Sequence, residues 1–144
     1  MELVKDVMTK KVITSSEDEA LINIGKKMAK HGISCIVVVK NKKPVGIITE
    51  RDLSQKVVAR NLDCKKTKAK QIMSKPVHTI KPETNIYFTN QLMKKKKFRR
   101  FPVAKDGNLV GIITQSDLIR YFTEQRKRFV IESLKRNIKG SYPI

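Results

Sequence analysis

The sequence contains the stretch Gly46-Ile47-Ile48-Thr49-Glu50-Arg51-Asp52-Leu53, which returns as Gly111-Ile112-Ile113-Thr114-Gln115-Ser116-Asp117-Leu118. The two copies are 65 residues apart (111 minus 46), and the same shift places Met8 on Met73. No insertion or deletion is needed from Lys5 to Leu53. A constant spacing over a whole segment indicates one structural unit that occurs twice.

Length and composition indicate a single module. A chain of 144 residues supports one hydrophobic core, and each copy would be marginal alone, so we expect the copies to pack on each other. No run approaches the roughly 18 apolar residues of a membrane span, and Lys5 and Asp6 interrupt the start, so no secretory signal is visible. Cys35 and Cys64 occupy unlike contexts, which argues against a disulfide and favours a cytoplasmic location.

The formal net charge of +19 is unevenly distributed. Residues 1–65 hold 13 basic and 8 acidic side chains, a net of +5, whereas residues 66–130 hold 16 and 4, a net of +12. The excess concentrates in Lys94–Lys97, Arg99-Arg100 and Arg126–Arg128. A basic surplus attracts polyanions such as nucleotides, nucleic acid or acidic membranes. Alternatively, a lysine-rich surface only keeps the protein in solution.

The sequence pattern of each copy predicts an extended segment followed by a helix. The extended pieces end at Thr14 and Thr79. In the first copy, Ser16 with Glu19 resembles a capping box at the helix start. In the second copy, we expect Pro82 to open the helix.

A hairpin and a second helix follow in each copy. The apolar, β-branched runs 33–39 and 98–104 predict strands, and Asp106-Gly107 is a strong hairpin signal. The returning strand then meets a helix that begins near Asp52 in the first copy and near Asp117 in the second. The predicted order of each unit is therefore β-α-β-β-α.

The repeat divides the chain into four parts. We expect a first repeat at 1–59, a linker at 60–68, a second repeat at 69–123 and a C-terminal helix and tail at 124–144. The helix after Leu118 is expected to continue towards Leu134, and the closing segment 139–143 is expected to fray.

The repeated Gly-Ile-Ile-Thr-x-x-Asp-Leu, the Met-Thr and Met-Ser leads and the order of elements resemble a tandem pair of CBS domains, often called a Bateman module. The resemblance covers roughly residues 3–123. It implies an α/β (α+β) fold in which two repeats pack sheet to sheet around a pseudo-two-fold axis and leave two clefts. Such clefts typically hold AMP, ADP, ATP or S-adenosylmethionine, and two modules commonly pair into a homodimer.

The two aspartates of the motif suit a ribose. A carboxylate can accept both ribose hydroxyls, and each hydrogen bond to a charged group contributes roughly 1.5–3 kcal/mol. Thr49 and Thr114 stand three residues before Asp52 and Asp117 and can donate to the sugar or phosphate. The free N–H groups of the helix start also attract anions. The alternative is that each Thr-Asp pair only caps a helix.

By the resemblance, each cleft takes its Thr-Asp pair from one repeat and its base-facing wall from the other. The wall opposite Asp52 would then contain His78, Thr79, Phe98, Arg99 and Arg100. The wall opposite Asp117 would contain Ile13, Thr14, Ile33, Ser34 and Cys35.

The arginines rank the two clefts. An arginine fork binds phosphate through two parallel hydrogen bonds, so the Asp52 cleft is our choice for a phosphorylated nucleotide. Strand side chains alternate, so only one of Arg99 and Arg100 need point inward. The Asp117 cleft suits an uncharged nucleoside group or no ligand. If the walls come from the same repeat, this ranking inverts. For His78, the alternative to a ligand contact is a structural or solvent-facing side chain.

The sequence indicates a binding protein. His31 and His78 offer no metal-ligand spacing, Cys35 resembles a buried small residue, and no catalytic order or Gly-rich phosphate loop is present. We expect a non-catalytic regulatory module that requires no cofactor, senses an adenine nucleotide or S-adenosylmethionine, and signals through a homodimer or a protein partner, without a membrane. The alternative is a nucleic-acid-binding protein that uses Lys94–Arg100 and Arg126–Arg128.

Overall fold

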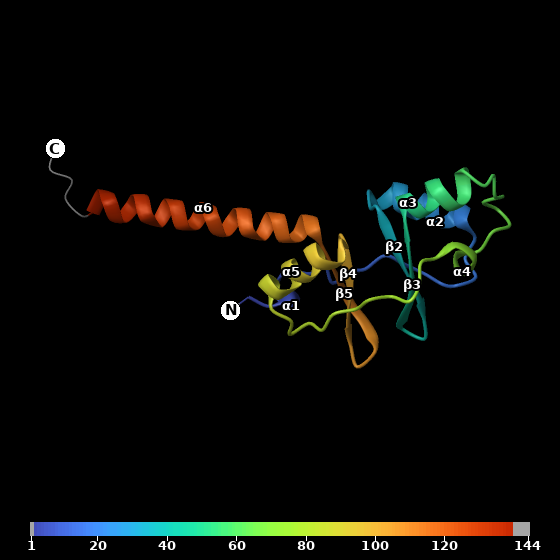
Figure 1. Cartoon of the computed structure of the whole chain (residues 1–144), viewed down its shortest axis with the longest axis horizontal. Helices are drawn as coiled ribbons and strands as arrows, with labels where there is room; N and C mark the ends of the chain where they lie inside the picture. Colours follow the sequence, from blue (N-terminus) through green and yellow to red (C-terminus); the bar gives the residue numbers. More distant parts are fainter. Residues whose placement is uncertain (1, 140–144) are drawn as a thin grey trace.

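The structure, a computed structural model, describes residues 2–139 and contains two repeats of one design (Figure 1). The first repeat consists of β1 (Thr14–Ser15), α2 (Leu21–His31), β2 (Cys35–Lys40), β3 (Lys43–Thr49) and α3 (Glu50–Asp52), which continues as the π-helical turn η1 (Leu53–Val58). The second consists of α5 (Ile86–Lys96), β4 (Arg100–Lys105), β5 (Asn108–Thr114) and α6 (Gln115–Lys139). Short helices precede each repeat, α1 (Val4–Val7) and α4 (Ala69–Ile72).

The sheets confirm the predicted repeat. In the first sheet β1 runs parallel to β2, and β2 runs antiparallel to β3. In the second, β4 and β5 are antiparallel, and a single parallel bridge from Ile80 to Val103 takes the place of the β1 pairing. Both hairpins carry an irregularity at the corresponding position, after Val38 and after Val103.

Both hairpins turn through two residues with positive φ. Asn41 and Lys42 have φ of 51° and 66°, and Asp106 and Gly107 have φ of 52° and 82°. Positive φ at both central residues defines the type I′ turn, whose twist matches that of the flanking strands. The turns point away from the strand ends at which the aspartates lie (Figure 1).

The predicted start of the first helix is wrong. Ser16 and Glu19 form only a turn, and α2 begins at Leu21 without a side-chain cap. The linker explains this difference, because the carbonyl groups of Thr67 and Cys64 accept the N–H groups of Leu21 and Ile22, both at 3.0 Å. These first N–H groups of α2 therefore need no side chain.

The predicted start of the second helix is also wrong. Instead of beginning at Pro82, α5 begins at Ile86, and the Asn85 side chain accepts hydrogen bonds from the N–H groups of Tyr87 and Phe88. The Pro82 carbonyl instead accepts a hydrogen bond from the N–H of Lys5 in α1, at 2.9 Å.

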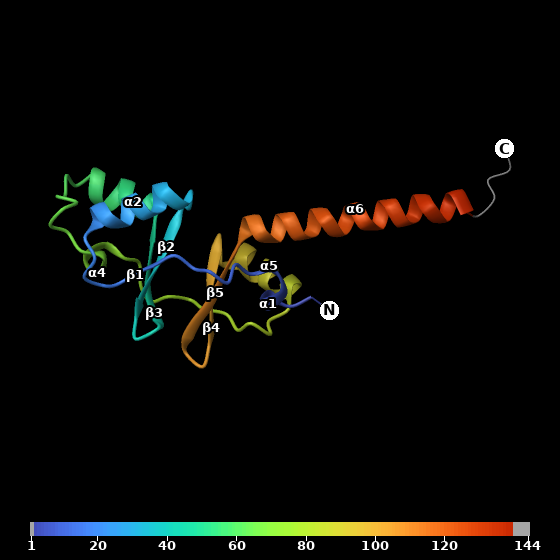
Figure 2. The ribbon, with the colours of Figure 1, turned by 180° about the vertical axis from the view of Figure 1, so that it is seen from behind.

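The lead of each repeat packs on the other repeat. Val4 is fully buried in the core of the second repeat, and Ala69 and Ile72 are buried in the core of the first. Figures 1 and 2 show the same exchange, with α1 beside α5 and α4 below α2. Isolated bridges join Thr9 to Ile112 and Ile47 to Ser74. Neither core is complete without the other repeat, which gives a physical reason for the two copies to form one module.

The last helix leaves the body of the molecule. Leu118 is buried in the second core and Phe122 packs against it, whereas the rest of α6 projects outward (Figures 1 and 2). Its remaining large apolar side chains are exposed, namely Ile119, Phe129, Val130, Ile131, Leu134 and Ile138. The predicted continuation of the helix towards Leu134 is confirmed, and α6 extends beyond it to Lys139 with no break between the second repeat and the C-terminal helix. The fraying predicted for 139–143 does not include Lys139, which is the last residue of α6, and residues 140–143 lie outside the described residues.

None of the helices between residues 2 and 139 combines the length and apolar character that crossing a membrane requires. Cys35 and Cys64 are both free, and Cys35 is buried.

Candidate functional site

Two cavities lie where the strand ends of one repeat meet the other repeat. The cavity beside Asp52, called here the Asp52 cleft, has a volume of about 810 Å³. The cavity beside Asp117, the Asp117 cleft, has a volume of about 490 Å³. Ligand sites are commonly concave and fall in this range of size.

The Asp52 cleft contains most of the residues that the sequence assigned to it. Thr49 and Asp52 come from the first repeat. The opposite wall comes from the second repeat and contains His78, Phe98, Arg99 and Arg100. Thr79 does not line the cavity and is exposed to solvent outside it.

The Asp117 cleft has the reciprocal construction. Thr114 and Asp117 face a wall from the first repeat with Ile13, Ile33, Ser34 and Cys35. Thr14 does not line it, because it belongs to β1, where its carbonyl accepts a hydrogen bond from Lys27 at 3.0 Å. Each aspartate therefore faces a wall that comes mainly from the opposite repeat, as the resemblance implied.

The arginine pair does not rank the clefts as expected. Arg99, Arg100 and Ser34 line both cavities. Arg99 precedes β4, so the alternation of strand side chains does not force the two arginines apart. Each cleft also has a basic residue of its own near the aspartate, Lys56 in one and Arg120 in the other.

The Thr-Asp pairs do cap their helices. The Asp52 Oδ2 accepts the N–H of Thr49 at 2.9 Å, and the Thr49 hydroxyl accepts the N–H of Asp52 at 3.1 Å. The same two bonds, with the same lengths, join Thr114 and Asp117. The cap uses Oδ2 of each aspartate and does not involve Oδ1, so the cap alone does not prevent ligand binding.

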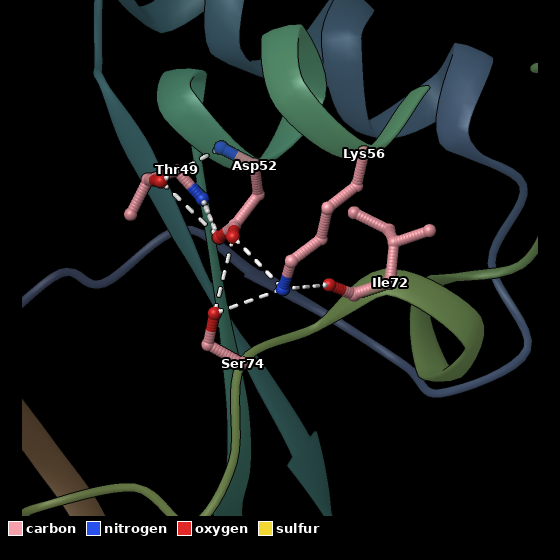
Figure 3. A network of polar contacts seen from close by, with 5 residues as sticks. All are labelled: Thr49, Asp52, Lys56, Ile72 and Ser74. Carbon is pink, nitrogen blue, oxygen red and sulfur yellow. Dashed lines mark hydrogen bonds and ion pairs between the residues drawn. The ribbon is translucent and has the colours of Figure 1, made fainter. Parts of the chain in front are cut away.

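Oδ1 of Asp52 is held by a polar network (Figure 3). It accepts the hydroxyl of Ser74 at 3.1 Å and lies 3.1 Å from the ammonium of Lys56. The Lys56 Nζ also donates to the carbonyl of Ile72 at 2.9 Å and to Ser74 Oγ at 3.2 Å. Ser74 belongs to the lead of the second repeat, so the network ties that lead to the aspartate of the first.

This network sets the charge of Asp52. Burial raises the pKa of the Asp52 carboxyl, but the hydrogen bonds from Thr49, Lys56 and Ser74 outweigh it and hold the pKa below its ordinary value. The carboxylate is therefore ionised at neutral pH, as an acceptor of hydroxyl groups must be.

Asp117 has fewer partners at the corresponding atom. Its Oδ1 meets only the guanidinium of Arg120, at 3.5 Å, and Arg120 is 72% exposed. Tyr121 stands where the first repeat has Lys56, and Thr9 stands where the second has Ser74. The two clefts are thus alike in their caps and different in what surrounds the free carboxylate oxygen.

An aromatic pair covers one side of the Asp52 cleft. The rings of His78 and Phe98 lie 5.1 Å apart, and both line the cavity. Aromatic side chains offer a face on which a nucleobase can stack. At the corresponding wall of the other cleft stand the aliphatic Ile13 and Ile33.

Cys35 has no nucleophilic character. Burial raises the pKa of its thiol, and the nearby Arg100 only partly opposes this effect. The thiol is therefore protonated at neutral pH. Among residues 2–139, no three His, Cys, Asp or Glu side chains gather closely enough to hold a metal ion.

Sequence reasoning missed both partners of the Asp52 Oδ1 atom, Lys56 and Ser74. Lys56 stands four residues after Asp52 on the same helical segment, a spacing at which side chains meet, so this signal was available. Ser74 is 22 residues away, and only the exchange of leads brings it to Asp52.

Comparison with known proteins identifies the family. The model of the CBS domain matches residues 4–59 and 69–124. An uncharacterised protein of Methanopyrus kandleri is 40% identical over 119 residues, which cover 81% of this chain and 61% of that protein. The chain belongs to the CBS domain family and contains a CBS domain pair, a regulatory module. It spans about three fifths of the length of the first curated relatives that it matches.

Two solved structures extend the comparison. The CBS domain pair of protein MJ0100, in complex with 5′-methylthioadenosine and S-adenosyl-L-methionine, is 31% identical with a TM-score of 0.78 and covers 87% of this chain and 98% of that chain. The hexameric CBS-CP12 protein from bloom-forming cyanobacteria is 29% identical with a TM-score of 0.74 and covers 83% and 70%.

Proposed function

We propose that this protein is a non-catalytic sensor of adenosine-containing ligands, which are AMP, ADP, ATP or S-adenosylmethionine. The observation that carries the proposal is the pair of cavities, each with a buried aspartate at the end of a strand and a wall from the other repeat. The adenosine-type ligands held by the similar CBS pair of protein MJ0100 support the same ligand class.

Each side of the Asp52 cleft suits one part of a nucleotide. Asp52 and Thr49 would bind the ribose, the His78–Phe98 pair would hold the base, and Arg99 and Arg100 would meet the phosphate. In the Asp117 cleft, the aspartate and Thr114 would bind a ribose against the aliphatic wall.

Calorimetric titration of AMP, ADP, ATP and S-adenosylmethionine into wild type, Asp52→Ala and Asp117→Ala tests this function. Loss of nucleotide binding in Asp52→Ala alone assigns the nucleotide to the Asp52 cleft, whereas loss in Asp117→Ala alone assigns it to the other. No heat with any ligand, in protein shown to be folded and free of ligand, refutes the sensor.

We further propose that the output is self-association through α5 and α6. Tyr87 and Phe88 on α5 and Ile119, Phe129 and Ile131 on α6 are each at least half exposed. A helix without tertiary contacts is marginal in water, so a second copy that covers these side chains would stabilise α6. The hexameric CBS-CP12 neighbour supports association between copies. A cytoplasmic location and independence from membranes stay predictions.

Nucleic-acid binding stays the second proposal. Lys94–Lys97 and Arg126–Arg128 are exposed and offer a basic surface to phosphates. A steep loss of binding to an oligonucleotide with added salt, together with no effect of Asp52→Ala, would support it over the sensor.

A further inference from the structure

The Asp52 carboxylate has no acceptor position free. Its four donors are the N–H and hydroxyl of Thr49 on Oδ2 and the Ser74 hydroxyl and Lys56 ammonium on Oδ1. An ionised carboxylate offers about four lone-pair positions, so these donors saturate it. A ribose can bind Asp52 only by displacing some of them.

The donors differ in how easily they leave. The bonds from Thr49 belong to the helix cap and involve the backbone. Lys56, by contrast, reaches Asp52 on a flexible four-carbon stem, and its side chain is 33% exposed. It also lines the cavity. Lys56 is therefore the charged donor that an incoming ribose would displace.

Displacement from Asp52 removes the negative charge that neutralises the Lys56 ammonium. In the present arrangement its three N–H donors match three acceptors, on Asp52, Ile72 and Ser74. Once the contact with Asp52 is lost, the Lys56 ammonium has only two neutral acceptors, the Ile72 carbonyl and the Ser74 hydroxyl. A partly buried charge without a counterion is unfavourable. A phosphate on the ligand would replace the lost carboxylate, whereas an uncharged nucleoside would not.

We propose that Lys56 is a specificity-determining residue of the Asp52 cleft, which exchanges the Asp52 carboxylate for a ligand phosphate and so selects phosphorylated adenosine ligands over uncharged ones. This inference rests on the proposed sensor function. The Asp117 cleft differs, because Tyr121 stands at the position of Lys56 and the basic residue near Asp117, Arg120, is 72% exposed, so water can solvate its charge.

The test compares AMP with adenosine. Both are titrated calorimetrically into the Asp117→Asn chain, in which the amide oxygen keeps the helix cap while the second cleft loses its carboxylate. The Lys56→Met substitution is then added. We expect adenosine to bind more tightly and the preference for AMP over adenosine to fall at least about tenfold, the size of one hydrogen bond to a charged group.

Two further variants control the test. Lys56→Arg keeps a cation at this position and should retain the preference for AMP. Lys105→Met removes a lysine that lines neither cavity and should leave the ratio of the two affinities as it is. The thermal unfolding midpoint of each variant establishes that it is folded.

An unchanged AMP-to-adenosine ratio in folded Lys56→Met overturns the inference while the sensor stands. An equal loss of preference in Lys105→Met also overturns it, because net charge alone would then explain the effect. If neither AMP nor adenosine binds a chain with both aspartates intact, the inference fails, and the proposed function fails with it only when ADP, ATP and S-adenosylmethionine give no heat either.

Discussion

At the scale of single residues, the close approach of the two leads depends on glycine. A Cβ added to Gly46 would clash with Sδ of Met73, and one added to Gly111 would lie 2.5 Å from Sδ of Met8. Real Cβ atoms essentially never have such contacts, so the lead methionines pack on strands that have no side chain at that point.

Gly46→Ala should therefore destabilise the fold by about 1–3 kcal/mol, as overpacking of a core does. Urea unfolding measures the change. Gly25→Ala is the matched control, because no heavy atom lies within 4 Å of its added Cβ. Gly25 lies inside α2, so its replacement should stabilise by up to about 1 kcal/mol. Equal effects of the two substitutions would contradict this account of Gly46.

Asp52 also predicts a pH dependence. Its folded pKa is below the ordinary value of 3.8, so the unfolded chain takes up the proton first as the pH falls. The stability that Asp52 contributes is present above about pH 4 and is lost as the pH falls through the folded pKa. Asp52→Asn should thus cost more unfolding free energy at pH 7 than at pH 3. Denaturant unfolding at both pH values checks this, and a constant difference would refute it.

At the scale of elements, the two matching helices begin differently. Asn85 caps α5 with its side chain, whereas Ala20 at the corresponding place of α2 makes no side-chain bond. The linker carbonyls replace the missing cap.

Asn85→Ala should lower the unfolding free energy by about 1 kcal/mol, the usual value of an N-cap. Ala20→Asn should change it by less than about half of that, since the first N–H groups of α2 already have partners. Thermal or urea unfolding of both variants tests the pair. A larger gain from Ala20→Asn would mean that the linker carbonyls are poor substitutes for a cap.

The elements also show what the sequence could and could not predict. The repeat, the strands and the Asp106-Gly107 turn follow from local pattern and are present in the structure. The helix starts did not follow, because the partners of their N–H groups come from residues distant in sequence, such as Thr67. Local motifs predicted a cap and could not reveal a carbonyl supplied by the linker.

The candidate site also contains residues that the sequence predicted and residues that it could not predict. The residues Thr49, Asp52, Thr114 and Asp117 lie in the clefts because the motif places them at strand ends. The placement of Ser74 against Asp52 depends on the exchange of leads, which no short-range pattern records. The ligand roles of these residues stay predictions until binding is measured.

At the scale of the whole molecule, the body and the projecting part of α6 are separable. A chain that ends at Thr123 should keep its fold, with a thermal midpoint within a few degrees of the full chain, because the side chains removed from α6 are mostly exposed. It should also lose self-association, which light scattering after size exclusion measures. An equal oligomeric state in both chains would place the contact between copies elsewhere.

Asp117 stands in the first turn of α6, the helix that ends 22 residues later at Lys139 (139 minus 117). At about 1.5 Å per residue, that distance is roughly 33 Å. A tilt of about 10° at the base would carry the far end sideways by about 6 Å. A small rotation of α6 about its first turn, which lines the Asp117 cleft, would thus move its far end much further, where a neighbouring molecule could contact it.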